Sequence, residues 1–531
     1  MSFVSLQFLG FLLIVFLLYY LIPKKIQWIF LLVCSYGFYL YGGIKPVFFM
    51  LFTTITTYAA ARWMDSMDFR HKKYIETNKE NLDKDSKKQL KAQNKSRKKK
   101  VFLGAMLANF GVLLLLKYYN FFAGSINDAF TFFEYNADLP LVNIILPLGV
   151  SFYTFQSIGY CIDIFRSKYR AESNIFKYAL FISFFPQVIQ GPISRFDQLG
   201  SQLFKPHKFN LKNIQFGLQL MLWGFFKKMV IADRAIVLVN QVFDNYTDYD
   251  GTQIFVAIII YTIQIYADFS GGIDITRGVA QVLGIDLIKN FERPYFSSSV
   301  PEYWRRWHIS LTQWMRDYVF YSLTLSKAMA KLGKWSRAHL KGNTAKQLPS
   351  YITTFTVFFL IGVWHGASWG HIVFGFYNGA VIVLGMICKP LFDFLIRVLK
   401  INTQCFSWKV WTIIRTYVIM TIAKCLVRAT NVSAAFSMIV ACKDMFVFTD
   451  LKHRLLDMGL DAVNLEVLFV ASVIFFIVSV VQENGISVRE KLAEQNLPFR
   501  WIFYIGIIVV ILIFGVYGPD TNVAEFIYRN Y

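Results

Sequence analysis

Two histidines occupy surroundings in which an imidazole is unusual. His365 lies in the segment GVWHGA (residues 362–367), within residues 351–388, which hold no Asp, Glu, Lys or Arg. His308 ends the segment WRRWH (residues 304–308). An ionisable side chain at membrane depth costs about 2.5–3.5 kcal/mol when charged, so by default it marks a functional site. We therefore predict that both histidines serve an active site. The alternative for His365 is a structural hydrogen bond between helices.

Imidazole accepts and donates protons near neutral pH, so the pair suits proton transfer, with one histidine acting as general base on a hydroxyl beside an acyl thioester. The sequence has no H-E-x-x-H motif, no dense ligand cluster and no C-x-x-C among its six cysteines, so no metal site is expected. It also lacks the G-x-S-x-G, Walker A and G-x-G-x-x-G motifs. The residues alone leave a membrane-embedded histidine-dependent transferase or a proton-coupled transporter.

The composition indicates a membrane protein. The chain has 531 residues, of which 56% are hydrophobic and 54 are phenylalanine, and it contains several long apolar runs. These runs predict an all-α polytopic protein. The net charge of +22 would suggest nucleic acid in a soluble protein. Here the basic residues cluster in a few loops, as the positive-inside rule requires, so no nucleic-acid partner is expected.

Two basic stretches set the expected topology. Residues 62–100 carry 14 Lys/Arg against 6 Asp/Glu and are predicted to form a cytoplasmic loop. This loop is either a docking surface for an acidic partner or anionic lipid, or simply a solvated topogenic loop. Residues 327–346 carry five Lys, one Arg and no acid, and are also expected in the cytoplasm. The apolar N-terminal segment, residues 3–22, is read as a retained span because it lacks a basic leader and a cleavage site.

Two segments are expected not to cross the membrane. Residues 178–193 contain Pro186, Gly191 and Pro192 and have basic residues on both sides, which favours a re-entrant segment. Residues 302–319 place their large apolar side chains on one helical stripe and their charges opposite, which predicts an amphipathic helix in the plane of the interface. Further spans are predicted at residues 26–43, 45–61, 101–123, 141–165, 229–243, 252–283, 411–427, 432–448, 463–481 and 501–517.

Six motifs together resemble the membrane-bound O-acyltransferase family. They are LPLGVSFYTFQ (146–156), FFPQ with GPI (184–187, 191–193), ADFSG (267–271), FERPY (291–295), WRRWHISL (304–311) and GVWHGA (362–367). The chain is most similar to the bacterial branch that includes the membrane protein of alginate O-acetylation and the teichoic-acid D-alanyl transfer protein. The resemblance runs in order through about residue 390.

The resemblance implies one membrane-embedded domain over residues 1–531. In this fold a ring of about 11 transmembrane helices, with re-entrant and in-plane helices, surrounds a central funnel. It also implies that His365 is the catalytic histidine and that His308 is a second polar residue needed for activity. The side chains expected to line the funnel are Trp304, Arg305, Trp307, Trp364, Asp268 and Gln187. Asp274 and Arg277, spaced i,i+3, are expected to form a structural ion pair or to line the site.

The function implied is O-acylation, most simply O-acetylation, of an extracytoplasmic polysaccharide by a multi-pass protein of the cytoplasmic (inner) membrane. The acyl donor would be a cytoplasmic thioester, acetyl-CoA or an acyl carrier protein, with no permanently bound cofactor. Besides membrane lipid and the polysaccharide, an extracytoplasmic SGNH-type acetyl-transfer protein is an expected partner. The alternatives are D-alanyl transfer to teichoic acid and a histidine-gated transporter. A transporter would more often show an internal repeat, which this sequence lacks.

Two features leave the acceptor open. After Arg316-Asp317-Tyr318 the chain continues into the basic insert 327–346 rather than the short Gly/Asn-rich turn usual in alginate-type members. The C-terminal tail, residues 518–531, is rich in aromatic residues and ends at Tyr531. We interpret it either as an interfacial anchor or, by resemblance to related acyl-transfer systems, as an acyl relay in which the Tyr531 hydroxyl takes the acyl group.

Overall fold

The computed structural model describes residues 4–135, 138–142, 147, 149–188, 190–447 and 449–517. The chain divides into two compact units: unit 1 comprises Met1–Gly217 with Val279–Ile288, and unit 2 comprises Leu218–Gly278 with Lys289–Tyr531. Every secondary-structure element in the described part is a helix, which confirms the all-α prediction. The C-terminal tail 518–531, including Tyr531, lies outside the described residues.

Within the described ranges, eight helices are long and apolar enough to cross a membrane. They are α3 (Ile44–Thr77), α4 (Lys84–Phe132), α11 (Gly251–Val282), α16 (Gly342–His365), α17 (Trp369–Ile387), α19 (Phe406–Arg428), α22 (Ala462–Glu483) and α24 (Leu497–Phe514). The polytopic membrane class is thereby confirmed. The predicted number of about 11 spans, the ring and the funnel stay predictions. α1 (Leu6–Leu21) is apolar but has 16 residues, and α2 (Gln27–Leu40) has 14.

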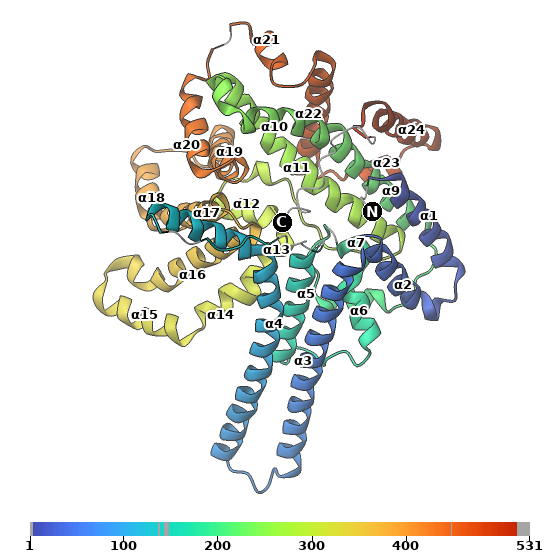
Figure 1. Cartoon of the computed structure of the whole chain (residues 1–531), viewed down its shortest axis with the longest axis vertical. Helices are drawn as coiled ribbons and strands as arrows, with labels where there is room; N and C mark the ends of the chain where they lie inside the picture. Colours follow the sequence, from blue (N-terminus) through green and yellow to red (C-terminus); the bar gives the residue numbers. More distant parts are fainter. Residues whose placement is uncertain are drawn as a thin grey trace. The chain divides into compact units, whose positions relative to one another are not determined.

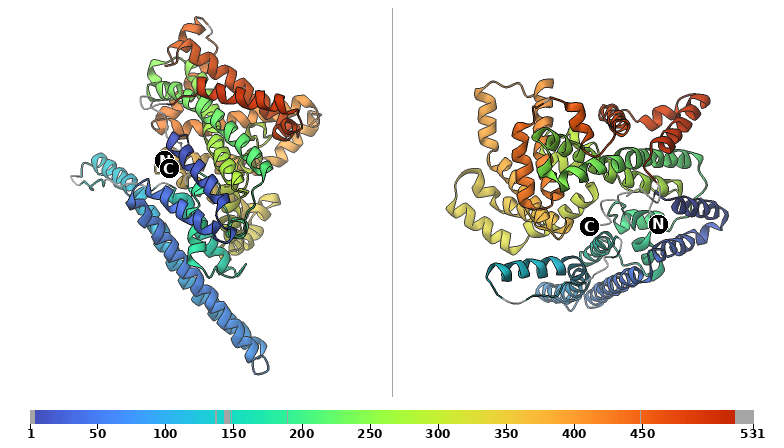
Figure 2. Two further views of the ribbon diagram at one scale, coloured as in Figure 1. Left: turned by 90° about the vertical axis from the view of Figure 1, so that its right-hand side faces the viewer. Right: turned by 45° about the horizontal axis from the view of Figure 1, so that its top comes forward.

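The basic stretch 62–100 lies on the ends of α3 and α4 and on residues 78–83 between them, so most of the predicted loop is helical, and its place in the cytoplasm stays a prediction. α3 and α4 continue far past their apolar parts and form a two-helix hairpin that projects from the rest of unit 1 (Figures 1 and 2). Asp83 caps α4 by accepting a hydrogen bond from the Ser86 amide at 3.1 Å. Lys98, 3% exposed, lies 2.5 Å from the Asp68 carboxylate. This buried ion pair joins the two helices where the hairpin leaves the unit.

The predicted non-spanning segment of unit 1 is a broken helix. α6 (Ile175–Ser183) ends at Phe184, and the short α7 (Phe185–Val188) follows. Gln187 lies on α7 and is buried, and its side-chain amide donates to Gln156 Oε1 at 2.6 Å. Gln156 belongs to α5 (Val150–Phe165), which begins nine residues later than the span predicted from residue 141. α6 and α7 are too short to span, as expected of a re-entrant segment.

In unit 2 a π-helical stretch, Phe226–Ala232, connects α9 (Leu211–Phe225) to α10 (Asp233–Asp244). It contains Lys227 and Lys228, whose side chains are buried. α9 crosses α11 closely, because Gly224 faces the backbone of Gly271 with no room for a Cβ on either residue. The predicted span 229–243 therefore begins inside an irregular helix, and α10 has only 12 residues.

The helix predicted over 302–319 is interrupted. α12 (Val300–Arg306) stops before Trp307, and α13 (Ile309–Trp314) begins after His308, which adopts a left-handed backbone with φ 46°. A π-helical turn, Met315–Phe320, and α14 (Tyr321–Thr324) follow. The predicted apolar stripe of Trp304, Trp307, Leu311, Trp314 and Tyr318 is buried inside unit 2. A single amphipathic helix on an interface is therefore wrong, because the stripe packs against protein.

The basic insert and the predicted span 432–448 both form short helices of unit 2. The basic insert forms α15 (Lys327–His339), which packs against α16 as a helical hairpin (Figure 1). The predicted span 432–448 is wrong: α20 (Val432–Ala441) has 10 residues. After α20 the chain turns, and the carbonyls of Met445 and Val447 accept hydrogen bonds from Thr252 at the start of α11.

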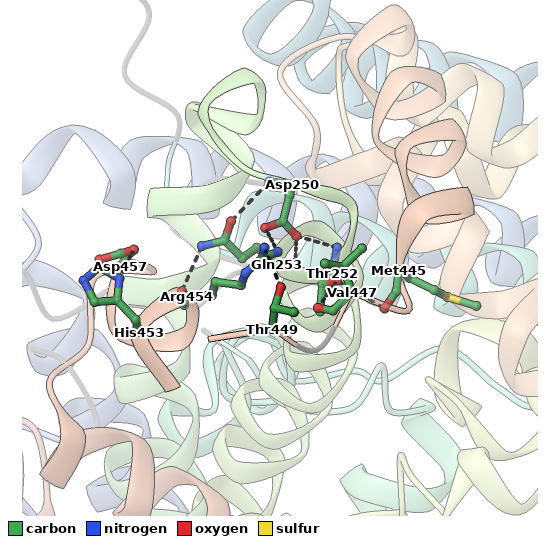
Figure 3. Close-up of polar contacts among 9 residues, drawn as sticks. All are labelled: Asp250, Thr252, Gln253, Met445, Val447, Thr449, His453, Arg454 and Asp457. Atoms are coloured by element: carbon green, nitrogen blue, oxygen red, sulfur yellow. Dashed lines mark hydrogen bonds and ion pairs between the residues drawn. The ribbon is translucent and has the colours of Figure 1, made fainter. Parts of the chain in front are cut away.

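The N-terminus of α11 is held by backbone carbonyls of Met445, Val447 and Arg454 and by the Arg454 side chain, as Figure 3 shows. Asp250 accepts hydrogen bonds from the amides of Thr252 and Gln253, at 2.8 and 3.1 Å, and pairs with Arg454 at 2.5 Å. Gln253 Nε2 donates to the Arg454 carbonyl at 2.8 Å. The polar residues just before α11, Asp250 above all, thus satisfy its free amides.

Candidate functional site

His365 is the last residue of α16. α17 begins at Trp369, and Ser368 caps it while its hydroxyl lies 2.7 Å from Nδ1 of His371. The turn must be tight because the His371 ring occupies the space where a side chain at Gly366 would point. α16 and α17 also approach closely at Gly362, which faces the backbone of Gly375. The glycines of the motif thus fix where α16 ends and where His365 points.

A small cavity of about 50 Å³ opens beside His365. Its wall consists of Tyr261, Ile265, Phe269, Tyr303, Trp304, Trp307, His365, Phe374, Met420, Lys424 and Val427, all of unit 2. The predicted lining residues Trp304 and Trp307 are therefore brought together with His365. Trp304 is fixed by a hydrogen bond from its indole N–H to Asn378 Oδ1 at 3.2 Å. The wall is almost wholly apolar around one imidazole and one amine, and apolar surroundings strengthen electrostatic interactions with a reacting group.

His308 is fully buried behind this wall. Its Nδ1 lies 3.4 Å from Asn290 Oδ1, and the same oxygen accepts the Ser310 amide at 2.9 Å. The Asn290 carbonyl accepts the Ile309 amide at 3.0 Å. Asn290 therefore holds the left-handed turn that places His308, a conformation that a non-glycine residue keeps only when its surroundings enforce it.

Aromatic rings connect the two histidines. The His308 ring lies 4.9 Å from Phe269 and 5.8 Å from Trp364, centroid to centroid. Trp364 is buried and lies 5.0 Å from the neighbouring His365 ring. The structure thus brings both predicted histidines to one site, with His365 on the cavity and His308 one ring layer behind it.

The burial of His308 decides what its imidazole does. Burial lowers the pKa of His308 from 6.5 to about 3. A ring with that pKa stays neutral at physiological pH and is a poor proton acceptor. This environment favours a role for His308 in orienting its neighbours over a role in proton transfer.

An ion-pair network that the sequence did not reveal ties the FERPY and WRRWH segments together. Glu483, the last residue of α22, accepts from Arg293 Nε at 2.6 Å and from Arg306 Nη1 at 2.9 Å. Arg306 also pairs with Glu302 at 2.7 Å. The backbones join as well, since the Glu292 amide donates to the Arg306 carbonyl at 2.9 Å. The loop that carries His308 is therefore anchored to a C-terminal helix.

A second unexpected residue is Lys424 of α19. Its side chain is 5% exposed and lines the cavity together with His365. Its ammonium donates to Tyr295 Oη at 2.8 Å and lies 4.3 Å from the centre of that ring. The available signal is a basic residue inside a predicted span, but Arg415 shares that signal, so the sequence does not single out Lys424.

Four predicted lining residues are not among those that line the cavity: Trp364, which packs between the two histidines, and Asp268, Arg305 and Gln187. Asp268 pairs with Lys228 at 2.6 Å, Lys228 also pairs with Asp233 at 2.7 Å, and Asp268 is not among the residues lining the cavity. Arg305 is exposed on α12. Gln187 belongs to unit 1. The predicted pair of Asp274 and Arg277 is present at 3.6 Å, and Asp274 also pairs with Lys227 at 2.7 Å.

A larger cavity of about 710 Å³ also lies in unit 2. Lys227, Asp274, Arg277, Asn290 and Arg293 line its polar side, and its apolar side includes Trp223, Phe475, Phe503 and Ile507. Tyr266 and Phe291 face this cavity and also contact Trp307, at 6.0 and 5.0 Å between ring centres. One layer of aromatic rings therefore separates the two cavities.

The arrangement favours proton and acyl transfer. No group of three or more His, Cys, Asp or Glu side chains in the described ranges could hold a metal ion. His365 at the cavity has the chemistry of a general base toward a hydroxyl, and the dry wall around it strengthens any electrostatic interaction with a reacting carbonyl.

The sequence of this chain is similar to those of several bacterial acyl-transfer proteins. The chain is 30% identical over 453 residues to the probable alginate O-acetylase AlgI of Pseudomonas syringae pv. tomato, covering 85% of this chain and 76% of the relative. It is 30% identical over 303 residues to the peptidoglycan O-acetyltransferase of Helicobacter pylori, covering 52% of this chain and 53% of the relative. It is 27% identical over 297 residues to the teichoic acid D-alanyltransferase of Bacillus subtilis, covering 55% of this chain and 69% of the relative.

The family model for membrane-bound O-acyltransferases matches residues 165–427, which include the FERPY, WRRWH and GVWHGA segments. Both histidines and the whole lining of the small cavity fall within that range. The fold, the motifs and the relatives agree: the chain belongs to the membrane-bound O-acyltransferase family and is an acyltransferase.

Proposed function

We propose that this acyltransferase O-acetylates an extracytoplasmic cell-surface polysaccharide from a cytoplasmic thioester donor. The observation that carries the proposal is His365 at a small, mostly apolar cavity with His308 held one ring away. A cavity of about 50 Å³ suits a group as small as acetyl. The relatives matched at 30% identity are named for O-acetylation, of alginate and of peptidoglycan.

In the proposed reaction His365 removes the proton from an attacking hydroxyl, and the oxygen adds to the thioester carbonyl. The carbon–sulfur bond then breaks, and the leaving thiolate takes the proton from the imidazolium. An acyl ester and a free thiol result, and His365 returns to its neutral form. His308 fixes the position of Trp364 and thereby of His365.

The donor would be acetyl-CoA or an acetylated acyl carrier protein, and the chain would work in the cytoplasmic (inner) membrane. An extracytoplasmic SGNH-type protein would pass the acetyl group to the polysaccharide. We further propose that Tyr531 is the acyl relay, on the strength of its place in the aromatic tail. Tyr531→Phe removes the hydroxyl and keeps the ring, so wild-type acylation in that variant would leave only the anchor interpretation.

The test is His365→Ala in cells, with ester-linked acetate released from the envelope polysaccharide by mild base and normalised to protein in the membrane. We expect the acetate to fall to the level of a deletion strain. His339→Ala is the matched control, because His339 is exposed on α15 and away from the cavity lining.

Other outcomes decide between the alternatives. Release of D-alanine in place of acetate would assign the chain to the teichoic-acid type of transfer, as the Bacillus subtilis relative is named. Normal esterification with His365→Ala would remove this histidine from the mechanism. Accumulation of an acylated intermediate on one side of the membrane, without loss of ester synthesis, would favour a transporter.

A further inference from the structure

Lys424 is a buried lysine of unit 2. It lies in α19, where it faces three aromatic side chains of two distant motifs. Its ammonium is 4.3 Å from the ring centre of Tyr295, 5.1 Å from Trp307 and 5.3 Å from Tyr303. Rings at these distances stabilise a cation through their negatively polarised faces.

The hydrogen bond to Tyr295 has a defined direction. The Tyr295 hydroxyl donates to the carbonyl of Thr262, so its lone pairs are left for Lys424. The Lys424 nitrogen, 2.8 Å away, is therefore the donor in this pair. An ammonium has three N–H groups, and one of them is used here.

Within the described ranges no carboxylate pairs with this cation, whereas the buried Lys227 and Lys228 both form ion pairs. A buried charge without a counter-ion is costly. Side chains held in this way are concentrated at functional sites, where an anion forms or binds.

The remaining face of Lys424 is the cavity that it lines together with His365. We propose that the Lys424 ammonium is a further catalytic residue, which donates a hydrogen bond to the oxyanion formed from the acyl carbonyl. The inference rests on the acyl transfer proposed above. When the hydroxyl oxygen adds to the thioester, the carbonyl electron pair moves to oxygen, and Lys424 stabilises that charge while keeping its proton. The oxyanion collapses as the carbon–sulfur bond breaks.

The aromatic cage, made of Tyr295, Tyr303 and Trp307, explains how the cation is kept ready. Tyr295 belongs to FERPY, and Tyr303 and Trp307 lie in or beside WRRWH, the segment that also carries His308. Their rings restrict the lysine chain and favour its charged form, so the amine is positioned before the reaction begins. A fixed donor in a dry site loses no energy to reorganisation when negative charge appears.

The experiment compares Lys424→Met with wild type in membranes that retain the extracytoplasmic acetyl-transfer partner, with acetyl-CoA as donor and the cell-surface polysaccharide as acceptor. Methionine keeps the cage filled but removes the charge. We expect kcat to fall about 100-fold to 1,000-fold, the usual effect of losing one oxyanion donor, with KM for the donor little changed. Lys409→Met is the matched control, since Lys409 is exposed on the same helix.

A second variant separates charge from packing. Lys424→Ala leaves space for a propyl chain, so added propylammonium should restore part of the activity, whereas 1-propanol should not. Rescue by both compounds, or by neither, would overturn the inference and leave Lys424 a packing residue. Wild-type kcat in Lys424→Met, or a rise in KM alone, would overturn it as well.

The outcomes also separate this inference from the function on which it rests. If wild type transfers acetyl, His365→Ala does not and Lys424→Met matches wild type, only the role of Lys424 fails. If wild type transfers no acyl group to any polysaccharide under conditions that keep it folded, the proposed function fails and this role fails with it.

Discussion

The imidazole of His308 packs on the indole of Trp364, with ring centroids 5.8 Å apart and an interplanar angle of 60°. Trp364 precedes His365 in the chain, so this contact joins the two histidine motifs through one buried ring. A buried histidine can therefore control the position of a histidine that faces the cavity without touching any substrate.

From this contact we expect His308→Ala to reduce acyl transfer by about 100-fold, with residual activity remaining. Loss of the ring leaves Trp364 unsupported, and small displacements of a catalytic group cost about that much. The measurement is ester-linked acetate per amount of membrane protein, beside the His339→Ala control. An undiminished rate would show that the packing on Trp364 does not position His365.

The burial of His308 also predicts a pH dependence of stability. Its pKa is about 3 in the folded protein and rises to the ordinary 6.5 when the chain unfolds, so the unfolded chain binds the proton more readily. This contribution is present above pH 6.5 and is lost as the pH falls towards 3, by up to about 1.4 kcal/mol per pH unit for one proton. Thermal unfolding in detergent at about pH 7.5 and about pH 5, on either side of the unfolded-state pKa, should show a larger drop in Tm for wild type than for His308→Asn. Equal drops in Tm for the two proteins would contradict a lowered pKa of His308 in the folded state.

The network at Glu483 should matter for activity as well as stability. Glu483→Gln removes the charge that holds Arg293 and Arg306, and hydrogen bonds between charged groups are worth about 1.5–3 kcal/mol each. We expect a lower Tm and a reduced kcat, because the loop carrying His308 loses its anchor. Glu490→Gln, at an exposed position on α23 (Val488–Ala493), is the control. A normal Tm with normal transfer would show that the backbone pairing alone holds the loop.

The turn after His365 should not tolerate a side chain. In Gly366→Ala the new methyl group would meet the His371 ring, so either that ring or the end of α16 must move. We expect acyl transfer to fall at least tenfold with protein still in the membrane. Gly385→Ala is the control, because that glycine of α17 has open space around it. Wild-type activity in Gly366→Ala would show that His371 moves aside freely.

The sequence alone determined the class of protein, and it singled out His308 and His365 as candidate site residues. Long apolar runs identify membrane helices because helix length and hydrophobicity are local properties, and α11, α19, α22 and α24 appear close to where they were predicted. An imidazole in an uncharged segment is equally visible, as is the ion pair of Asp274 with Arg277 one helical turn away.

Local patterns failed where packing or polar contacts overrode them. Helical periodicity predicted one amphipathic helix over 302–319, yet the contacts of Asn290 break it at His308. Basic composition predicted a loop over 62–100, yet α3 and α4 continue through it, because lysine and glutamate are good helix formers. Charge density indicates which residues meet water and says little about whether the backbone is helical.

Only the tertiary structure decided which distant residues share the site. Lys424 meets Tyr295 across 129 positions of the chain, and Glu483 meets Arg293 across 190. Neither pair can be recognised from periodicity or spacing in the sequence, since its two residues lie in different segments. The hydrophobic pattern of each segment indicates only which of its residues are buried. These contacts depend on how α19 and α22 pack around the two motifs. Such packing follows from the three-dimensional fit of side chains, which no single segment contains.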